Sequence, residues 1–159
     1  MYGHGRLRFA ILEYASLPSF STYTDQVVAN AQAFGAALAK EGFRNVSGGT
    51  ENHMVLLDLR EFDRELTGKA AQEVLDRAGI TTNRNTIPDD PRSAFITSGL
   101  RLGSAAETTA GMKEGEFETI ASLMSRALRH RDDDAIVAEV RADVAKMCAS
   151  FNPYANFTK

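Results

Sequence analysis

The segment from Asn83 to Gly103 constrains the fold more than any other stretch of the sequence. Its first part is a polar loop in which Pro88 and Pro91 fix the backbone, because each proline locks φ and disfavours helix in the residue before it. Its second part, residues 94–102, is rich in apolar residues and is typical of a strand. The segment therefore predicts a rigid loop that leads into a strand of a sheet.

A single charged side chain, that of Arg101, interrupts this strand between Leu100 and Leu102. A buried charge requires a partner, and the planar guanidinium matches a carboxylate or phosphate through two parallel hydrogen bonds. Gly99 and Gly103 on either side would let a ligand approach the backbone closely. The expected partner is therefore either an acidic side chain of this protein, in a structural ion pair, or an anionic ligand.

The rest of the chain alternates between helical and strand patterns. Helical spacing and end signals predict helices that cover residues 18–42, 67–78, 113–128 and 133–151. Further strands are expected at residues 45–47, 53–59 and 80–83. The order helix, strand, strand, helix, strand, strand, helix, helix predicts an α+β fold of two layers with a small, largely antiparallel sheet.

Composition excludes several classes of protein. A length of 159 residues with 43% apolar residues suits one domain with a core of its own. A net charge of -3 argues against a nucleic-acid-binding surface. No run approaches the roughly 20 apolar residues that a membrane span needs, and the start shows no signal-peptide pattern. A single cysteine precludes an internal disulfide, so we expect a cytoplasmic protein.

Other polar residues have structural interpretations. The acidic cluster at residues 132–134 precedes a helix, where negative charge favours capping over metal binding, so we predict no metal site. Cys148 falls on the apolar face of the last helix and is expected to be a buried, unreactive thiol. His53 is expected to be a structural residue beside its strand, and His4 a solvated terminal residue.

Five blocks of sequence occur in an order and at a spacing that one enzyme family shares. They are Ser47-Gly-Gly-Thr-Glu-Asn-His53 with the following strand, Leu66-Thr-Gly-Lys69, Asn83-Arg-Asn-Thr-Ile-Pro88, Asp90-Pro-Arg-Ser-Ala-Phe95 and Thr97-Ser-Gly-Leu-Arg-Leu-Gly103. Through them, residues 20–154 resemble serine hydroxymethyltransferase. The chain departs from that pattern at a few positions, among them Glu51, Arg84, Ala94, Ala110 and Met112.

The resemblance implies the C-terminal small domain of a fold-type-I pyridoxal-phosphate enzyme. Such an enzyme interconverts serine and glycine and passes a one-carbon unit to tetrahydrofolate. By position, Arg101 would hold the carboxylate of the amino-acid substrate and Asn85 would contact the folate ring. Ser93, Ala94 and Phe95 would line the same folate pocket.

The family's large domain, which carries the lysine that binds pyridoxal phosphate covalently, has no counterpart here. The five lysines of the chain are all expected at exposed helix or terminal positions, so we expect no catalytic residue and no covalent cofactor on this chain. Residues 1–19 would be an irregular or partly helical segment, and residues 20–159 would be the C-terminal domain, beginning with the family's connecting helix.

Two functions remain open at this stage. In the first, the chain is part of a serine hydroxymethyltransferase and is inactive without a large domain, which could be made as a separate chain. In the second, it is a stand-alone, non-catalytic domain that binds a small carboxylate, a folate or a protein partner. In the first case, the apolar surface left exposed where the large domain belongs predicts self-association or a dedicated partner.

Overall fold

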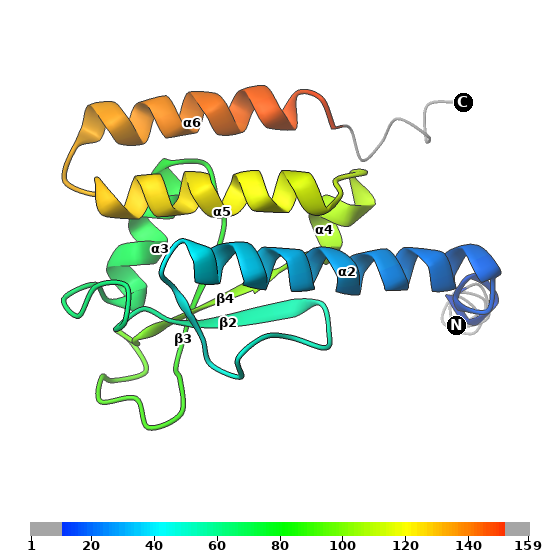
Figure 1. Cartoon of the computed structure of the whole chain (residues 1–159), viewed down its shortest axis with the longest axis horizontal. Coiled ribbons are helices and arrows are strands. Elements are labelled where there is room, and N and C mark those ends of the chain that lie inside the picture. The colour runs from blue at the N-terminus through cyan, green and yellow to red at the C-terminus, as the bar shows by residue number, and fades with distance from the viewer. Residues whose placement is uncertain (1–10, 152–159) are drawn as a thin grey trace, which may run out of the picture.

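The structure, a computed structural model, describes residues 11–151 and has two layers (Figure 1). One layer is a four-stranded sheet and the other consists of helices. The strands are β1 (Arg44–Asn45), β2 (Met54–Asp58), β3 (Asn83–Asn85) and β4 (Gly99–Gly103). The helices are α2 (Pro18–Lys40), α3 (Gly68–Arg77), α4 (Ala105–Thr109), α5 (Glu114–Arg129) and α6 (Asp134–Cys148).

The sheet has the order β1-β2-β4-β3, and each neighbouring pair is antiparallel. β2 and β4 form its centre, with Met54 opposite Gly103 and Asp58 opposite Gly99. Both edge strands are short, which limits pairing with other chains. This arrangement confirms the predicted α+β fold with a small antiparallel sheet.

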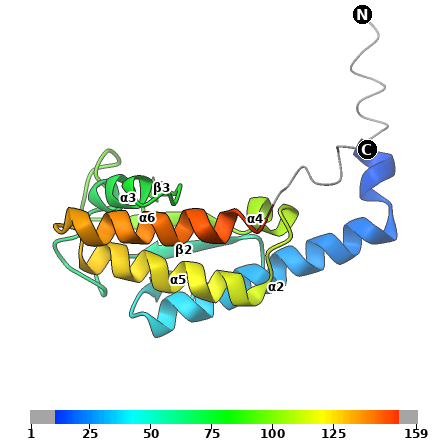
Figure 2. The same cartoon turned by 90° about the horizontal axis from the view of Figure 1, so that it is seen from above.

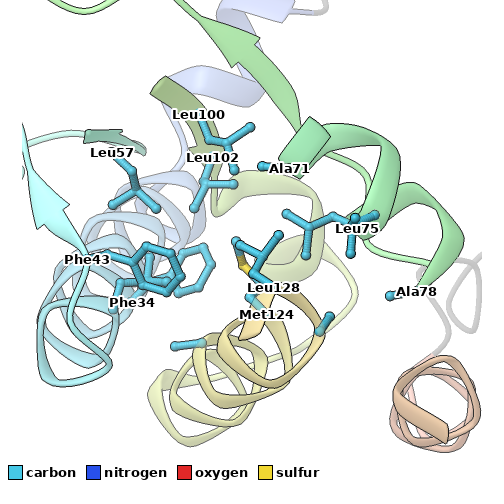
Figure 3. Packing of buried hydrophobic residues seen from close by; sticks show 14 of the residues in the cluster. Phe34, Phe43, Leu57, Ala71, Leu75, Ala78, Leu100, Leu102, Met124 and Leu128 are labelled. Carbon is cyan, nitrogen blue, oxygen red and sulfur yellow. The ribbon is translucent and has the colours of Figure 1, made fainter. Parts of the chain in front are cut away.

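The hydrophobic core lies between one face of the sheet and the helices (Figure 3). Leu57 on β2 and Leu100 on β4 point into it and are fully buried. Helices α2 and α5 meet above the sheet, where the rings of Phe34 and Phe117 pack edge to face with centroids 5.5 Å apart. Within residues 11–151, the helices cover one face of the sheet and leave the opposite face open.

The predicted helix ends are confirmed where side chains and glycines specify them. Thr67 caps α3 by accepting a hydrogen bond of 3.0 Å from the backbone N–H of Ala70. Asp133 caps α6 and accepts from the N–H of Ala135 and of Ile136, which confirms its interpretation as a capping residue. Gly42 follows α2 with a φ of 95°, a conformation that glycine adopts at little cost.

Both strands around the central loop begin later than expected. β3 covers Asn83–Asn85 instead of residues 80–83, and β4 begins at Gly99 instead of residue 94. Before β4, the carbonyl of Ser93 accepts hydrogen bonds from the N–H of Ile96 and of Thr97, and Thr97 has a φ of 57°. This turn uses the backbone groups that a strand would need, so the apolar run at 94–97 forms a loop.

Two further expectations were wrong or incomplete. The five-residue helix α4 was not predicted, because it is too short to show a periodic pattern. Cys148 is exposed, although it was expected on a buried face. Helix α6 forms the outer edge of the helical layer and buries only Val137, Val140 and Val144, so its last turn has no layer above it.

Within residues 11–151, no helix combines the length and the apolar character required to cross a membrane.

Candidate functional site

The open face of the sheet carries the two polar residues on which the sequence argument depended most. Along β4, Leu100 and Leu102 face the core, so Arg101 between them faces the other way and is exposed. The expectation of a buried charge was therefore wrong. The apolar neighbours reflect the period of two along a strand and say nothing about the environment of the arginine itself.

Strand pairing places Arg101 and Asn85 on the same face. Arg101 lies between Leu56 on β2 and Asn83 on β3, directly across from each. Two residues further along β4, Gly99 lies between Asp58 on β2 and Asn85 on β3. Because residues two apart on a strand point to the same side, Asn83 and Asn85 both share the face of Arg101.

Arg101 and Asn85 line one hollow of about 720 Å³. Leu56 forms part of its floor on the sheet, and the loop of residues 47–52 forms a wall. Gln32, from the exposed side of α2, completes the lining and donates a hydrogen bond of 3.4 Å to the carbonyl of Thr50. The structure thus brings together the predicted substrate-binding arginine and the predicted folate-binding asparagine.

Sequence reasoning missed the contribution of Gln32 and of the 47–52 loop to this hollow. The sequence argument used the loop only as part of a family motif, although its fold gives it a definite shape. Asn52 Oδ1 accepts a hydrogen bond of 2.8 Å from the N–H of Met54, and Gly48 has a φ of 74°. Gln32 had no signal at all, because an exposed polar residue on a long helix is ordinary in any sequence.

The guanidinium of Arg101 forms no ion pair with any residue of the described part of the chain. Glu51 lies in the wall of the same hollow, yet no carboxylate among residues 11–151 comes within 4.0 Å of the arginine. Of the two partners considered for Arg101, the structural ion pair is thus not formed within this region. The paired donors remain available to an anion that enters the hollow.

The amide of Asn85 is partly engaged. Its Nδ2 donates a hydrogen bond of 2.7 Å to the carbonyl of Thr86. This bond orients the side chain of the half-buried Asn85. Its amide oxygen remains available as a hydrogen-bond acceptor.

The loop between β3 and β4 is held by Asp90. Its carboxylate accepts hydrogen bonds from Ser98 Oγ at 2.7 Å and from the N–H of Ser98 at 2.9 Å and of Arg92 at 3.0 Å. Burial alone would raise the pKa of Asp90, but these hydrogen bonds outweigh it and lower the pKa. Arg92 then donates to the carbonyls of Arg64 and Leu66, which ties the loop to the start of α3.

The remaining predicted folate residues lie elsewhere in this loop. All three residues, Ser93, Ala94 and Phe95, are exposed, and Phe95 has 79% of its surface accessible to solvent. None of the three lines the hollow that contains Arg101 and Asn85. Their role in binding folate stays a prediction.

A second charged group lies at the far end of the open face. Asp58 is 1% exposed and forms ion pairs with Arg60 at 2.8 Å and with Arg44 at 3.0 Å. The hydrogen bonds from Arg60 hold its pKa below the ordinary value, against the opposing effect of burial. Because both arginines are already paired, this cluster is a structural brace of the strand ends.

Among the described residues, no lysine is placed to bind a cofactor covalently, and no cluster of metal ligands occurs. Lys40, Lys69, Lys113 and Lys146 are all exposed, and none lines the hollow. A covalent bond to pyridoxal phosphate needs a lysine in a dry pocket beside the cofactor, so the described lysines do not fit that group. No group of three or more potential metal ligands occurs in residues 11–151.

Comparison with known proteins places these features in a family. The sequence model of serine hydroxymethyltransferase matches residues 8–124. Serine hydroxymethyltransferase 2 of Mesorhizobium japonicum is 50% identical over 141 residues, which are 89% of this chain and 32% of that protein. The chain belongs to the serine hydroxymethyltransferase family.

The match to serine hydroxymethyltransferase confirms the resemblance drawn from the five sequence blocks. It includes all four strands and therefore the entire open face with Asn85 and Arg101. The chain spans about a third of the length of the curated relative that it matches. About two thirds of that relative's length has no counterpart in these 159 residues.

Proposed function

We propose that this chain is the C-terminal part of a serine hydroxymethyltransferase and completes an active site whose other half belongs to a large domain. Arg101 binds the carboxylate of serine or glycine, and Asn85 contacts the folate co-substrate. Ser93, Ala94 and Phe95 line the pocket for the same folate. One observation supports this most directly: Arg101 and Asn85 share one accessible hollow on the open face of the sheet.

The open face suits contact with a second domain. Met54 and Phe95 are large apolar residues that remain exposed, and Leu56 is only half-buried in the floor of the hollow. Covering such surface with another domain removes it from water at a gain of about 25 cal/mol per Å². The same contact would exclude water from Arg101, which strengthens its hydrogen bonds to a carboxylate.

The cofactor requirement follows from the same division of roles. Pyridoxal phosphate supplies the electron sink for cleavage at the amino-acid carbon. No described lysine of this chain fits it, so the large domain would hold it. This chain orients the substrate through Arg101, whose fork of donors fixes the carboxylate in one plane.

A chimera tests the proposal. We would replace the matching third of the Mesorhizobium japonicum protein with this chain and measure glycine formation from serine and tetrahydrofolate. Arg101→Ala should lower kcat/KM by about 30-fold to 1,000-fold, because losing a two-point carboxylate contact costs about 2 to 4 kcal/mol. The kcat/KM of Arg101→Lys should fall between those of the parent chimera and of Arg101→Ala, since lysine keeps the charge but cannot form the paired hydrogen bonds.

Arg141→Ala serves as the matched control, because Arg141 is an exposed arginine on α6 in the helical layer. It should leave kcat/KM unchanged. Equal kinetics for the parent chimera and Arg101→Ala would refute the assignment of Arg101.

The accessible Arg101 also supports the second candidate, a stand-alone domain that binds a carboxylate or a folate without catalysis. Titration of the isolated chain with glycine and with a folate distinguishes the two. Under the first proposal, binding is weak until the large domain is present. Micromolar binding by the isolated chain, together with an inactive chimera, would favour the second.

A further inference from the structure

A second hollow lies at the far end of the open face, around the buried carboxylate of Asp58, and has a volume of about 440 Å³. Such a volume is usual for small-molecule sites, which range from about 300 to 1,000 Å³. The hollow shares no lining residue with the one that contains Arg101 and Asn85. Four of its seven lining residues are arginines from three separate segments of the chain, and we call it the arginine hollow: Arg44, Arg60, Arg64 and Arg92.

Two of these arginines are held in place by Asp58. Arg60 donates from Nε at 2.9 Å and from Nη2 at 2.8 Å, one bond to each carboxylate oxygen. Arg44 donates from Nη1 to the same carboxylate at 3.0 Å, and its Nε lies 3.4 Å from a carboxylate oxygen of Glu61. Side chains that are already fixed lose little conformational freedom when a ligand binds.

The arginine hollow still offers unused donors to solvent. The side chains of Arg44 and Arg60 are 46% and 35% exposed, whereas that of Asp58 is 2% exposed. Within residues 11–151, Nη2 of Arg44 and Nη1 of Arg60 donate to no acceptor. Arg64 is exposed, and its guanidinium has no hydrogen-bond or ion-pair partner in the same region. Its backbone is nevertheless fixed, because its carbonyl accepts a hydrogen bond of 2.7 Å from Arg92.

The lining of the arginine hollow carries an excess of positive charge. Its four arginines face two carboxylates, those of Asp58 and Glu61, which leaves two positive charges without a counter-charge in the lining. The pKa of Arg60 is raised by its hydrogen bonds to Asp58 first, and also by the charges of Asp90 and Asp89, which lie outside the lining. These two carboxylates weaken the positive potential but do not occupy the unused donors, so an anion should bind with millimolar affinity.

We propose that the arginine hollow binds the phosphate group of a small phosphorylated molecule. A phosphate monoester carries a charge of about -1.5 to -2 at pH 7 and presents three acceptor oxygens, which suits both the excess charge and the several donors. A carboxylate has only one charge and two acceptor oxygens. The ring of Pro91 also lines the hollow and gives the carbon part of such a molecule an apolar contact. The inference is independent of the function proposed for Arg101.

Glycerol 3-phosphate and inorganic phosphate are suitable probes, with acetate as the singly charged comparison. We would titrate each into the whole chain by nuclear magnetic resonance at constant ionic strength, because salt screens exposed charges. Both phosphates should bind saturably and shift the signals of residues 58–64 and 90–92. Acetate should bind at least about fivefold more weakly, since it lacks the second charge.

Two variants change the affinity in opposite directions. Arg64→Gln should weaken phosphate binding about fivefold, the value of one hydrogen bond to a charged group at an exposed site. Glu61→Gln should strengthen it about twofold to fivefold, because it removes a competing carboxylate from Arg44. Arg84→Gln is the matched control for Arg64→Gln: Arg84 is an exposed arginine on β3 that does not line the hollow, and its replacement changes the net charge equally.

Any one of four results would overturn this inference. They are the absence of saturable binding by either phosphate, equal affinities of phosphate and acetate, equal phosphate affinities of Arg64→Gln and Arg84→Gln, and weaker phosphate binding by Glu61→Gln than by the parent. The third result would mean that the chain attracts anions only through its overall charge. Glu61, Arg64 and Arg84 are all exposed, so the variants should fold as the parent does, and circular dichroism checks this.

Discussion

Gly99 occupies the tightest position in the sheet, and its replacement by alanine gives a sharp test of the structure. A Cβ at this position would lie 2.5 Å from Ile87 Cγ2, 2.7 Å from the carbonyl oxygen of Leu57 and 2.8 Å from that of Asn85. Two of these three atoms belong to the backbones of β2 and β3, which flank Gly99 on either side. No side-chain rotation can relieve them, so the strands themselves must separate.

The expected cost follows from these contacts. Overpacking of this kind costs about 1 to 3 kcal/mol, and weakening a ladder hydrogen bond adds about 1 kcal/mol. Alanine also lowers the backbone entropy of the unfolded chain, which offsets about 0.4 to 1 kcal/mol of this destabilisation. We therefore expect Gly99→Ala to lower the free energy of unfolding by about 1 to 3.5 kcal/mol, which corresponds to roughly 2 to 14 °C in Tm.

Gly103 provides the control within the same strand. A Cβ there would have its nearest contact at 3.8 Å, the carbonyl oxygen of His53, an ordinary distance. Gly103→Ala should therefore change the stability by less than about 1 kcal/mol. Urea denaturation followed by circular dichroism measures both variants. If the stabilities of Gly99→Ala and Gly103→Ala agreed within about 0.5 kcal/mol, the usual error of such a comparison, the packing argument would be wrong.

Two further predictions concern charge and exposed surface. Because Arg60 lowers the pKa of Asp58 from its ordinary value of 3.8, the stabilisation from this pair is complete above about pH 4 and is lost as the pH falls through the lowered native value. Asp58→Asn should lower the free energy of unfolding by about 1 to 3 kcal/mol at neutral pH. It should also reduce the loss of stability that the parent chain shows as the pH falls below about 4. The first part of α2 and the helical stretch and turn at residues 11–17 extend beyond the sheet (Figure 2), and the exposed Leu12 and Leu17 there predict self-association. Light scattering should show oligomers that Leu12→Glu dissociates, and a monomer at high concentration would contradict this.

Local signals in the sequence were sufficient for the elements and their order. Thr67, Asp133 and Gly42 act through neighbouring backbone groups, so their positions alone identified the helix ends. The apolar spacing of α2 was also sufficient, because Val27, Phe34 and Leu38 repeat at helical intervals and are all buried. The family was recognisable as well, since its motifs are runs of adjacent residues.

The strand limits were not predictable, because they depend on hydrogen bonds between distant segments. Residues 94–98 have strand-like composition, yet Asp90 holds Ser98 in a loop through contacts that composition does not reveal. The exposure of Cys148 likewise depends on the place of α6 at the edge of the helical layer. Helical spacing identifies an apolar face but not how far the neighbouring elements extend over it.

The sequence by itself determined the fold class, the caps of α3 and α6 and the family, because these depend on short-range patterns. Only the tertiary structure decided that Arg101 is exposed, that it shares a hollow with Asn85, and that Gln32 and the 47–52 loop close that hollow. These residues come from α2, β3, β4 and the loop that precedes β2, and only the packing of these elements brings them together. The physical reason is that burial and proximity are properties of packed layers, and a linear pattern specifies which side of a strand a residue occupies without specifying what covers that side.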